Sequence, residues 1–99
     1  MELSFKKENT NLTVAVNGRI DSQTAGQLEE ELKQQIQDVN SVIFDCQNLE
    51  YMSSAGLRIM LATAKITGKR NGTTTLKNIN PEIRNVLEIT GMITILNVE

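Results

Sequence analysis

The sequence contains no histidine and no tryptophan, and its only cysteine is Cys46. Without histidine, the chain lacks the commonest general base and the commonest metal ligand of proteins. A single cysteine can form neither an internal disulfide nor a dithiol redox site, and it cannot build a thiolate metal cluster. These absences make catalysis a poor first hypothesis. We expect a small interaction domain that is not an enzyme and that holds no metal or cofactor.

Aromatic residues are also scarce, at 3% of the chain, namely Phe5, Phe44 and Tyr51. Proteins that bind single-stranded nucleic acid stack bases on aromatic side chains, and this chain offers almost none. Its 10 Lys and Arg are outnumbered by 12 Asp and Glu, which gives a net charge of −2. A protein that binds the phosphate backbone needs a basic excess, so we expect no nucleic-acid partner.

Long apolar runs are missing as well. No run approaches the roughly 20 residues that a membrane-spanning helix needs, so we expect no direct membrane insertion. Residues 1–7 lack the apolar core of a secretory signal peptide, and one unpaired cysteine fits a reducing compartment, so we expect a cytoplasmic protein. With 99 residues and 39% hydrophobic residues, the chain can build one core without metal or disulfide staples.

Hydrophobic periodicity predicts the elements of the first half of the chain. Residues 3–6 and 12–17 alternate apolar with polar or small residues, which predicts two strands joined as a hairpin. Apolar residues then recur at spacings of three and four through residues 25–39, which predicts an amphipathic helix. Asp21 or Ser22 can cap that helix.

The second half continues in alternating strands and helices. Residues 42–44 form an uninterrupted apolar run, which is typical of a strand covered on both faces. A helix over residues 57–66, a β-branched strand over 73–76 and a short helix capped by Asn80 follow. Residues 92–98 are apolar enough for a last strand or a packing segment. The predicted fold is therefore α/β, a mixed four- or five-stranded sheet packed against three or four helices, with the helices on one main face.

The segment from Asp45 to Leu57 joins the most apolar strand to the second long helix and carries two adjacent serines, Ser53 and Ser54. Ligands of α/β sheets bind at the carboxyl ends of strands, where helix N-termini present free N–H groups. Either serine could simply cap the helix, and Gly56 could simply allow close helix–sheet packing. Residue types alone favour these structural roles. The segment is not a phosphate-binding P-loop, and no histidine is present to activate a serine nucleophile.

The same segment resembles the signature of the STAS family, the domain of sulfate transporters and anti-sigma factor antagonists. Bacterial anti-sigma factor antagonists carry an acidic strand end, a mostly hydrophobic spacer and an Asp-Ser-Ser/Thr-Gly-Leu-like turn that opens a helix. Here Ser53-Ser54-Ala55-Gly56-Leu57 resembles that turn. Residues 18–25 resemble the family's Gly-x-hydrophobic-Asp-x-x-Thr-Ala segment, and residues 78–92 resemble its C-terminal helix and following turn. The resemblance implies one STAS domain over residues 1–99.

The resemblance also implies a function. In the family, the serine after the aspartate is phosphorylated by an anti-sigma factor serine kinase, and alignment on Gly56 places that serine at Ser54. The unphosphorylated protein would bind the anti-sigma factor and free the sigma factor for transcription, and the phosphorylated protein would release it. A serine phosphatase would reverse the modification. Ser53 stands where many such antagonists have aspartate, and Ala55 stands at the second Ser/Thr position, but neither departure removes the acceptor hydroxyl.

A partner-binding surface is expected around Ser54. Asp21 matches a family residue associated with partner or nucleotide contact, although a helix cap explains it equally well. Tyr51 and Met52 would suit an interface anchor if they are exposed, and core packing is the alternative. The candidate partner-binding residues are Asp21, Ser22, Tyr51, Met52, Ser53, Leu57 and Arg58.

Two other functions stay open at the level of sequence. The first is a STAS subunit that is not phosphorylated and serves a membrane transporter or a signalling scaffold, which Ser53 in place of aspartate favours. The second is a nucleotide-binding or weakly hydrolysing protein, for which the helix N-terminus at Ser54 is the only support.

Overall fold

Two N-terminal strands form the predicted hairpin. In this computed structural model, which describes residues 1–99, β1 (Glu2–Glu8) pairs antiparallel with β2 (Asn11–Ile20). Asn9 adopts a left-handed conformation with φ 55°, which asparagine tolerates better than most residues and which the tight turn uses. Leu12 and Val16 are fully buried between less buried neighbours, so the alternation of β2 marks one core-facing side.

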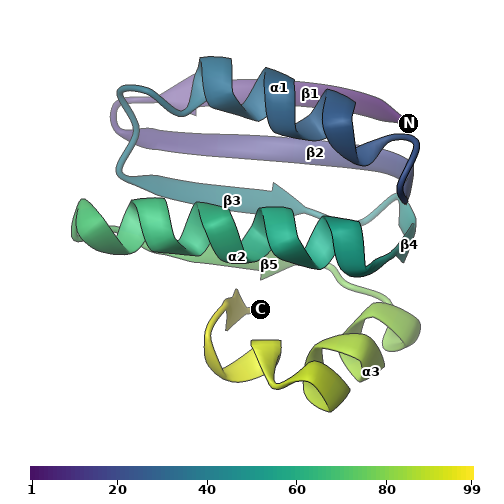
Figure 1. The fold of residues 1–99 in the computed structure, drawn as a ribbon. Helices are drawn as coiled ribbons and strands as arrows, with labels where there is room; N and C mark the ends of the chain where they lie inside the picture. Colours follow the sequence, from purple (N-terminus) through teal and green to yellow (C-terminus); the bar gives the residue numbers. More distant parts are fainter.

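The remaining strands extend the sheet from β2. They are β3 (Ser41–Asp45), β4 (Leu49–Met52), β5 (Thr74–Lys77) and β6 (Asn97–Val98). The main order is β1-β2-β3-β5-β6, with every pair after the hairpin parallel (Figure 1). β4 pairs with the last residues of β2. The predicted α/β class and mixed sheet are confirmed, with six strands rather than four or five.

β4 is the strand that sequence patterning did not predict. Its buried ends, Leu49 and Met52, flank two exposed residues, so it lacks the alternation of a half-buried strand. Its pairing with β2 also passes through a register shift between Gly18 and Arg19. A short strand of this kind is stabilised by its neighbour rather than by its own pattern.

Two helices, α1 (Ala25–Gln35) and α2 (Ser54–Lys69), lie next to each other over one face of the sheet, while α3 (Pro81–Thr90) lies beyond β5 (Figure 1). Three helices agree with the predicted three or four. The prediction that residues 42–44 form a strand covered on both faces is wrong, because Val42 and Phe44 are buried but Ile43 is only half-buried. The face without helices leaves Ile43 partly open.

The predicted helix over residues 25–39 ends earlier than expected, at Gln35. Val39 is still fully buried, because the chain turns back toward the sheet after α1. Arg70, just beyond α2, donates through Nη1 to the carbonyl oxygens of Ile36 and Val39, each at 2.6 Å. The guanidinium thus ties the turn that follows α1 to the end of α2.

The buried side of α2 contains two threonines that a purely apolar stripe does not predict. Thr63 donates to the carbonyl oxygen of Ile59 at 2.8 Å, and the Thr67 hydroxyl lies 2.9 Å from that of Thr74 on β5. Because their hydroxyls are hydrogen-bonded, these side chains can lie in the core at little cost.

The C-terminal elements follow local signals closely. Asn80 caps α3, accepting a hydrogen bond from the Ile83 N–H at 2.8 Å, and Gly91 ends it in the left-handed conformation with φ 77°. The segment 92–98 is both a packing segment and a strand, because the 3-10 helix η1 (Met92–Thr94) precedes β6.

Cys46 lies at the end of β3 and is 1% exposed. Burial raises the pKa of its thiol to about 12, and the nearby Asp45 carboxylate adds to the shift. The thiolate, not the thiol, is the form of cysteine that attacks thiol reagents. We therefore expect very slow labelling of Cys46 in the native protein and fast labelling in denaturant, followed with a chromogenic disulfide reagent. Fast labelling of the native protein would show that this end of β3 opens readily.

Candidate functional site

One backbone hydrogen bond joins the two segments that carry the predicted site residues. The N–H of Ser53 donates to the carbonyl oxygen of Ile20 at 2.8 Å. Asp21 and Ser22 follow Ile20 directly, and Ser54 follows Ser53, so the ends of β2 and β4 meet at the start of α2. Residues about thirty positions apart in the sequence therefore share one end of the sheet.

The two serines have different roles at this point. Ser53 is the N-cap of α2: its backbone is extended, at φ −85° and ψ 179°, and its Oγ accepts a hydrogen bond from the Ala55 N–H at 3.3 Å. Ser54 is the first residue of the helix and is exposed. Sequence reasoning left open which serine caps the helix, and the structure assigns that role to Ser53. The Ser54 hydroxyl is left facing solvent.

Asp21 organises the turn before α1. Its Oδ1 accepts hydrogen bonds from the N–H groups of Gln23, at 2.9 Å, and Thr24, at 3.1 Å. These two bonds hold the pKa of the Asp21 carboxyl below its usual value, and the bond from Gln23 has the larger effect. The N-cap of α1 is Thr24, so the prediction that Asp21 or Ser22 caps the helix directly is wrong. Asp21 caps the preceding turn instead, because the helix begins one turn later, at Ala25.

Tyr51 and Met52 do not form an exposed pair. Tyr51 is 38% exposed, but Met52 is only 3% exposed, because successive side chains of β4 point to opposite faces. Met52 is thus a core residue and not a partner-binding one. Arg19 of β2 lies over the Tyr51 ring, with Cζ 4.5 Å from the ring centre, which is the geometry of a cation–π contact. Sequence reasoning missed Arg19 because it did not predict that β4 pairs with β2.

Gly56 is required for close packing of α2 on the strands below it. A Cβ at this position would lie 2.5 Å from Cγ of Met52, closer than real Cβ contacts come, and 3.0 Å from Cγ2 of Ile20, which is tighter than most. The glycine lets the first turn of α2 sit directly on the ends of β2 and β4. Its packing role, one of the structural alternatives considered from sequence, is therefore borne out by the fold.

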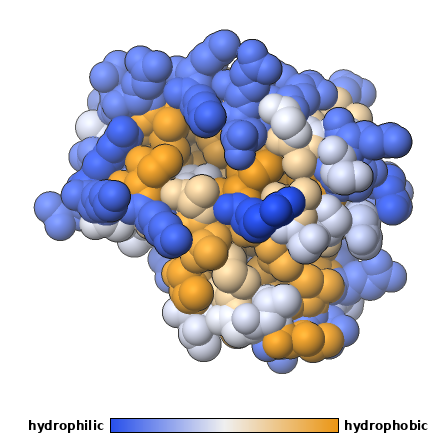
Figure 2. Space-filling model, in the orientation of Figure 1, coloured by the Kyte–Doolittle hydropathy of each residue, from blue (hydrophilic) through white to orange (hydrophobic).

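A groove of about 500 Å³ lies between the N-terminal halves of α1 and α2. Arg58 lines it from α2 and Glu29 from α1, over a floor that includes Ile59. Arg58 is exposed and stands four residues after Ser54, so both lie on the same side of the helix. Figure 2 shows apolar side chains between the two helices on this face. Leu57, at the edge of the predicted surface, is half-buried.

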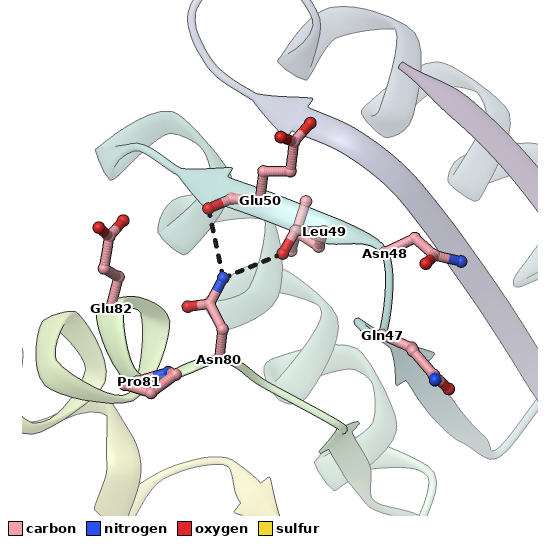
Figure 3. A pocket seen from close by; sticks show the side chains of 7 residues that line it. All are labelled: Gln47, Asn48, Leu49, Glu50, Asn80, Pro81 and Glu82. Atoms are coloured by element: carbon pink, nitrogen blue, oxygen red, sulfur yellow. Dashed lines mark hydrogen bonds between the residues drawn. The ribbon is translucent and has the colours of Figure 1, made fainter.

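The largest cavity, about 740 Å³, lies elsewhere and contains none of the predicted site residues (Figure 3). It opens between β4 and the start of α3. Asn80 crosses it, donating through Nδ2 to the carbonyl oxygens of Leu49, at 3.2 Å, and Glu50, at 3.3 Å. The other polar residues that line this cavity are Gln47, Asn48, Glu50 and Glu82. The asparagine therefore serves the fold, because it both caps α3 and holds β4.

No group of three or more Cys, Asp or Glu side chains is placed to hold a metal ion. None of the helices combines the length and the apolar character that crossing a bilayer requires.

The comparison with known families decides the assignment. A model of the STAS domain matches residues 2–99. This chain belongs to the STAS family. BtrV of Bordetella bronchiseptica, whose name assigns it to the anti-sigma factor antagonists, is 36% identical over 99 residues, covering 99% of this chain and 85% of that protein. By homology, the chain falls among the anti-sigma factor antagonists of the family.

Solved structures show the same fold. The anti-sigma factor antagonist SpoIIAA in its unphosphorylated form superposes with a TM-score of 0.80 at 18% identity, covering 99% of this chain and 87% of that one. The phosphorylated form of the Bacillus cell fate determinant SpoIIAA superposes with a TM-score of 0.78 at 19% identity, covering 99% and 91%. The unphosphorylated and the phosphorylated structure thus superpose on this chain to a similar degree.

Proposed function

We propose that this STAS protein binds an anti-sigma factor kinase while Ser54 is unphosphorylated and releases it when Ser54 carries a phosphate. The observation that carries the proposal is the division of roles at the start of α2. Ser53 caps the helix, and Ser54 beside it is exposed. A kinase can modify Ser54 without removing a hydrogen bond on which the helix depends.

Phosphorylation at this position is compatible with a folded domain. A phosphate adds a charge of about −1.5 to −2, and a helix N-terminus favours negative charge. The Ala55 N–H donates to the Ser53 hydroxyl, but the other N–H groups in the first turn of α2 that lack intrahelical partners can donate to the phosphate oxygens. The structures of SpoIIAA support this proposal, because both of its forms resemble this chain to a similar degree.

The effect of the phosphate would therefore fall on the partner. A surface that docks around a neutral hydroxyl would have to desolvate a dianion or place it near its own acidic groups. The exposed Tyr51 ring with Arg19 over it, and the Arg58 side chain, offer contacts around Ser54. The proposed surface consists of Arg19, Asp21, Ser22, Tyr51, Ser53, Ser54, Leu57 and Arg58.

Two parts of the proposal come from the family. A serine phosphatase would remove the phosphate and restore binding, and the released sigma factor would then direct transcription. The protein would regulate transcription through binding and would catalyse no reaction itself. ATP would be bound by the kinase.

Phosphate transfer tests the proposal. The anti-sigma factor kinase of the same organism is incubated with ATP and either the wild-type protein or a serine variant, and mass spectrometry locates the phosphate. We expect one phosphate on the wild type, none on Ser54→Ala and nearly unchanged transfer to Ser53→Ala. Transfer to Ser53 would place the acceptor one residue earlier. If the kinase binds this protein but never phosphorylates it, the result would favour the alternative function, a STAS subunit that is not phosphorylated.

A further inference from the structure

The outer edge of β1 is open. The sheet order places β1 at one end, and its seven residues pair only with β2 (Figure 1). The opposite edge strand, β6, has only two residues. Short edge strands offer little to pair with, whereas a long one presents a row of unpaired N–H and C=O groups. β1 is therefore the edge at which another strand can add to the sheet.

The sequence of β1 is complementary to itself in one antiparallel register. When two copies align with Ser4 opposite Ser4, Glu2 of each copy faces Lys6 of the other. Leu3 of each copy then faces Phe5 of the other. Each favourable pair occurs twice because of the two-fold symmetry. Opposite charges and apolar pairs directly across two antiparallel strands both stabilise the pairing.

Neighbouring registers lack this complementarity. Centring the pair on Phe5 would place Glu2 opposite Glu8, which brings like charges together. Centring it on Leu3 would leave Glu2 opposite Ser4 and no ion pair. Of these three registers, only the Ser4-centred one places both Glu2 and Lys6 opposite a residue of the opposite charge.

The burial of β1 agrees with the Ser4-centred register. Glu2, Ser4 and Lys6 are exposed, while Leu3 and Phe5 are half-buried and pack against the core. In this register these exposed residues of both copies lie on one face of the joined sheet, and Leu3 and Phe5 of both copies lie on the other face. Lys6 now pairs with Glu8 of its own strand at 3.3 Å, and both side chains are highly exposed, so this contact is easily exchanged.

We propose that a second copy of this chain binds to the β1 edge and that the two sheets continue into one another. The interface is a single pair of strands, so we expect a reversible dimer rather than an obligate one. β1 and β4 lie on opposite sides of β2 (Figure 3), which leaves the Ser54 surface open in the dimer. The proposal does not depend on phosphorylation.

Charge reversal tests the dimer by sedimentation velocity over a wide range of protein concentration at low salt. The wild type should shift from monomer to dimer as concentration rises. Glu2→Lys or Lys6→Glu should weaken dimerisation at least about tenfold, because each turns two attractive pairs into repulsive ones. The double variant Glu2→Lys/Lys6→Glu should restore it. The matched controls Glu8→Lys and Lys7→Glu change charge outside the proposed ion pairs and should leave the dimer intact.

A cysteine at the symmetry axis gives a second measurement. Two Ser4→Cys side chains would face each other across strands whose Cα atoms are about 5 Å apart, within the range that a disulfide spans. Mild oxidation should give a covalent dimer with Ser4→Cys and not with Glu8→Cys, while the buried Cys46 stays unreacted. A wild type that remains monomeric at every concentration, equal cross-linking of both variants or failure of the double charge reversal to restore the dimer would overturn the proposal.

Discussion

Ser54→Asp is expected to lower the affinity for the anti-sigma factor by about two orders of magnitude or more, because docking must then bury a poorly paired charge. The domain should stay folded, since an acidic residue at a helix N-terminus is tolerated or favoured. Thermal melts establish folding, and titration calorimetry with the purified anti-sigma factor measures the affinity.

The neighbouring serine supplies the matched control. Ser53→Asp adds the same charge one residue earlier, where aspartate is a good N-cap, and should weaken binding much less. Ser54→Ala removes only an exposed hydroxyl and should bind like the wild type. If Ser53→Asp blocks binding while Ser54→Asp does not, the acceptor is Ser53. If neither variant changes the affinity, a phosphate switch at this turn is wrong.

Gly72→Ala is expected to destabilise the domain by about 3 kcal/mol or more, because its methyl group would overlap the backbone carbonyl of Asn40. The chain cannot easily move aside at this point. The Gly72 N–H donates to the Thr67 carbonyl at 2.7 Å, and the next carbonyl, that of Thr73, accepts from the Val42 N–H at 2.9 Å. Chemical denaturation in urea measures the loss.

Gly68→Ala is the matched control for this prediction. Gly68 lies in the last turn of α2, where a Cβ would meet nothing within 4 Å. Alanine there should leave the free energy of unfolding unchanged or raise it by up to about 1 kcal/mol, since alanine favours helix more than glycine does. Equal stabilities for the two variants would show that the turn after α2 relaxes away from Asn40.

The site combines a fixed scaffold with an exposed serine, Ser54. The Ser53 cap, the Ile20–Ser53 backbone bond and the close contact at Gly56 hold the first turn of α2 in place. The Asp21 carboxylate is held by hydrogen bonds from two N–H groups. A partner that docks here would meet a preorganised surface, which lowers the cost of ordering that surface on binding.

Local patterns in the sequence were sufficient for most elements. The alternation in β2, the Asn80 cap and Gly91 each act over a few residues, so the sequence alone identifies the strand and both ends of α3. The order of the short motifs around Ser54 was likewise enough to indicate the STAS family. None of these signals depends on which segments meet in space.

Tertiary structure decided what depends on distant neighbours. β4 exists because β2 offers it hydrogen-bonding partners, and that pairing buries Met52 and brings Arg19 over Tyr51. Thr67 lies in the core because its hydroxyl is hydrogen-bonded to that of Thr74 on another element. Arg70 binds carbonyls in the turn after α1, more than thirty residues earlier. The choice between Ser53 and Ser54 as cap was also decided there. The Ile20 carbonyl fixes the backbone of Ser53, and Ser54 beside it is left exposed to solvent.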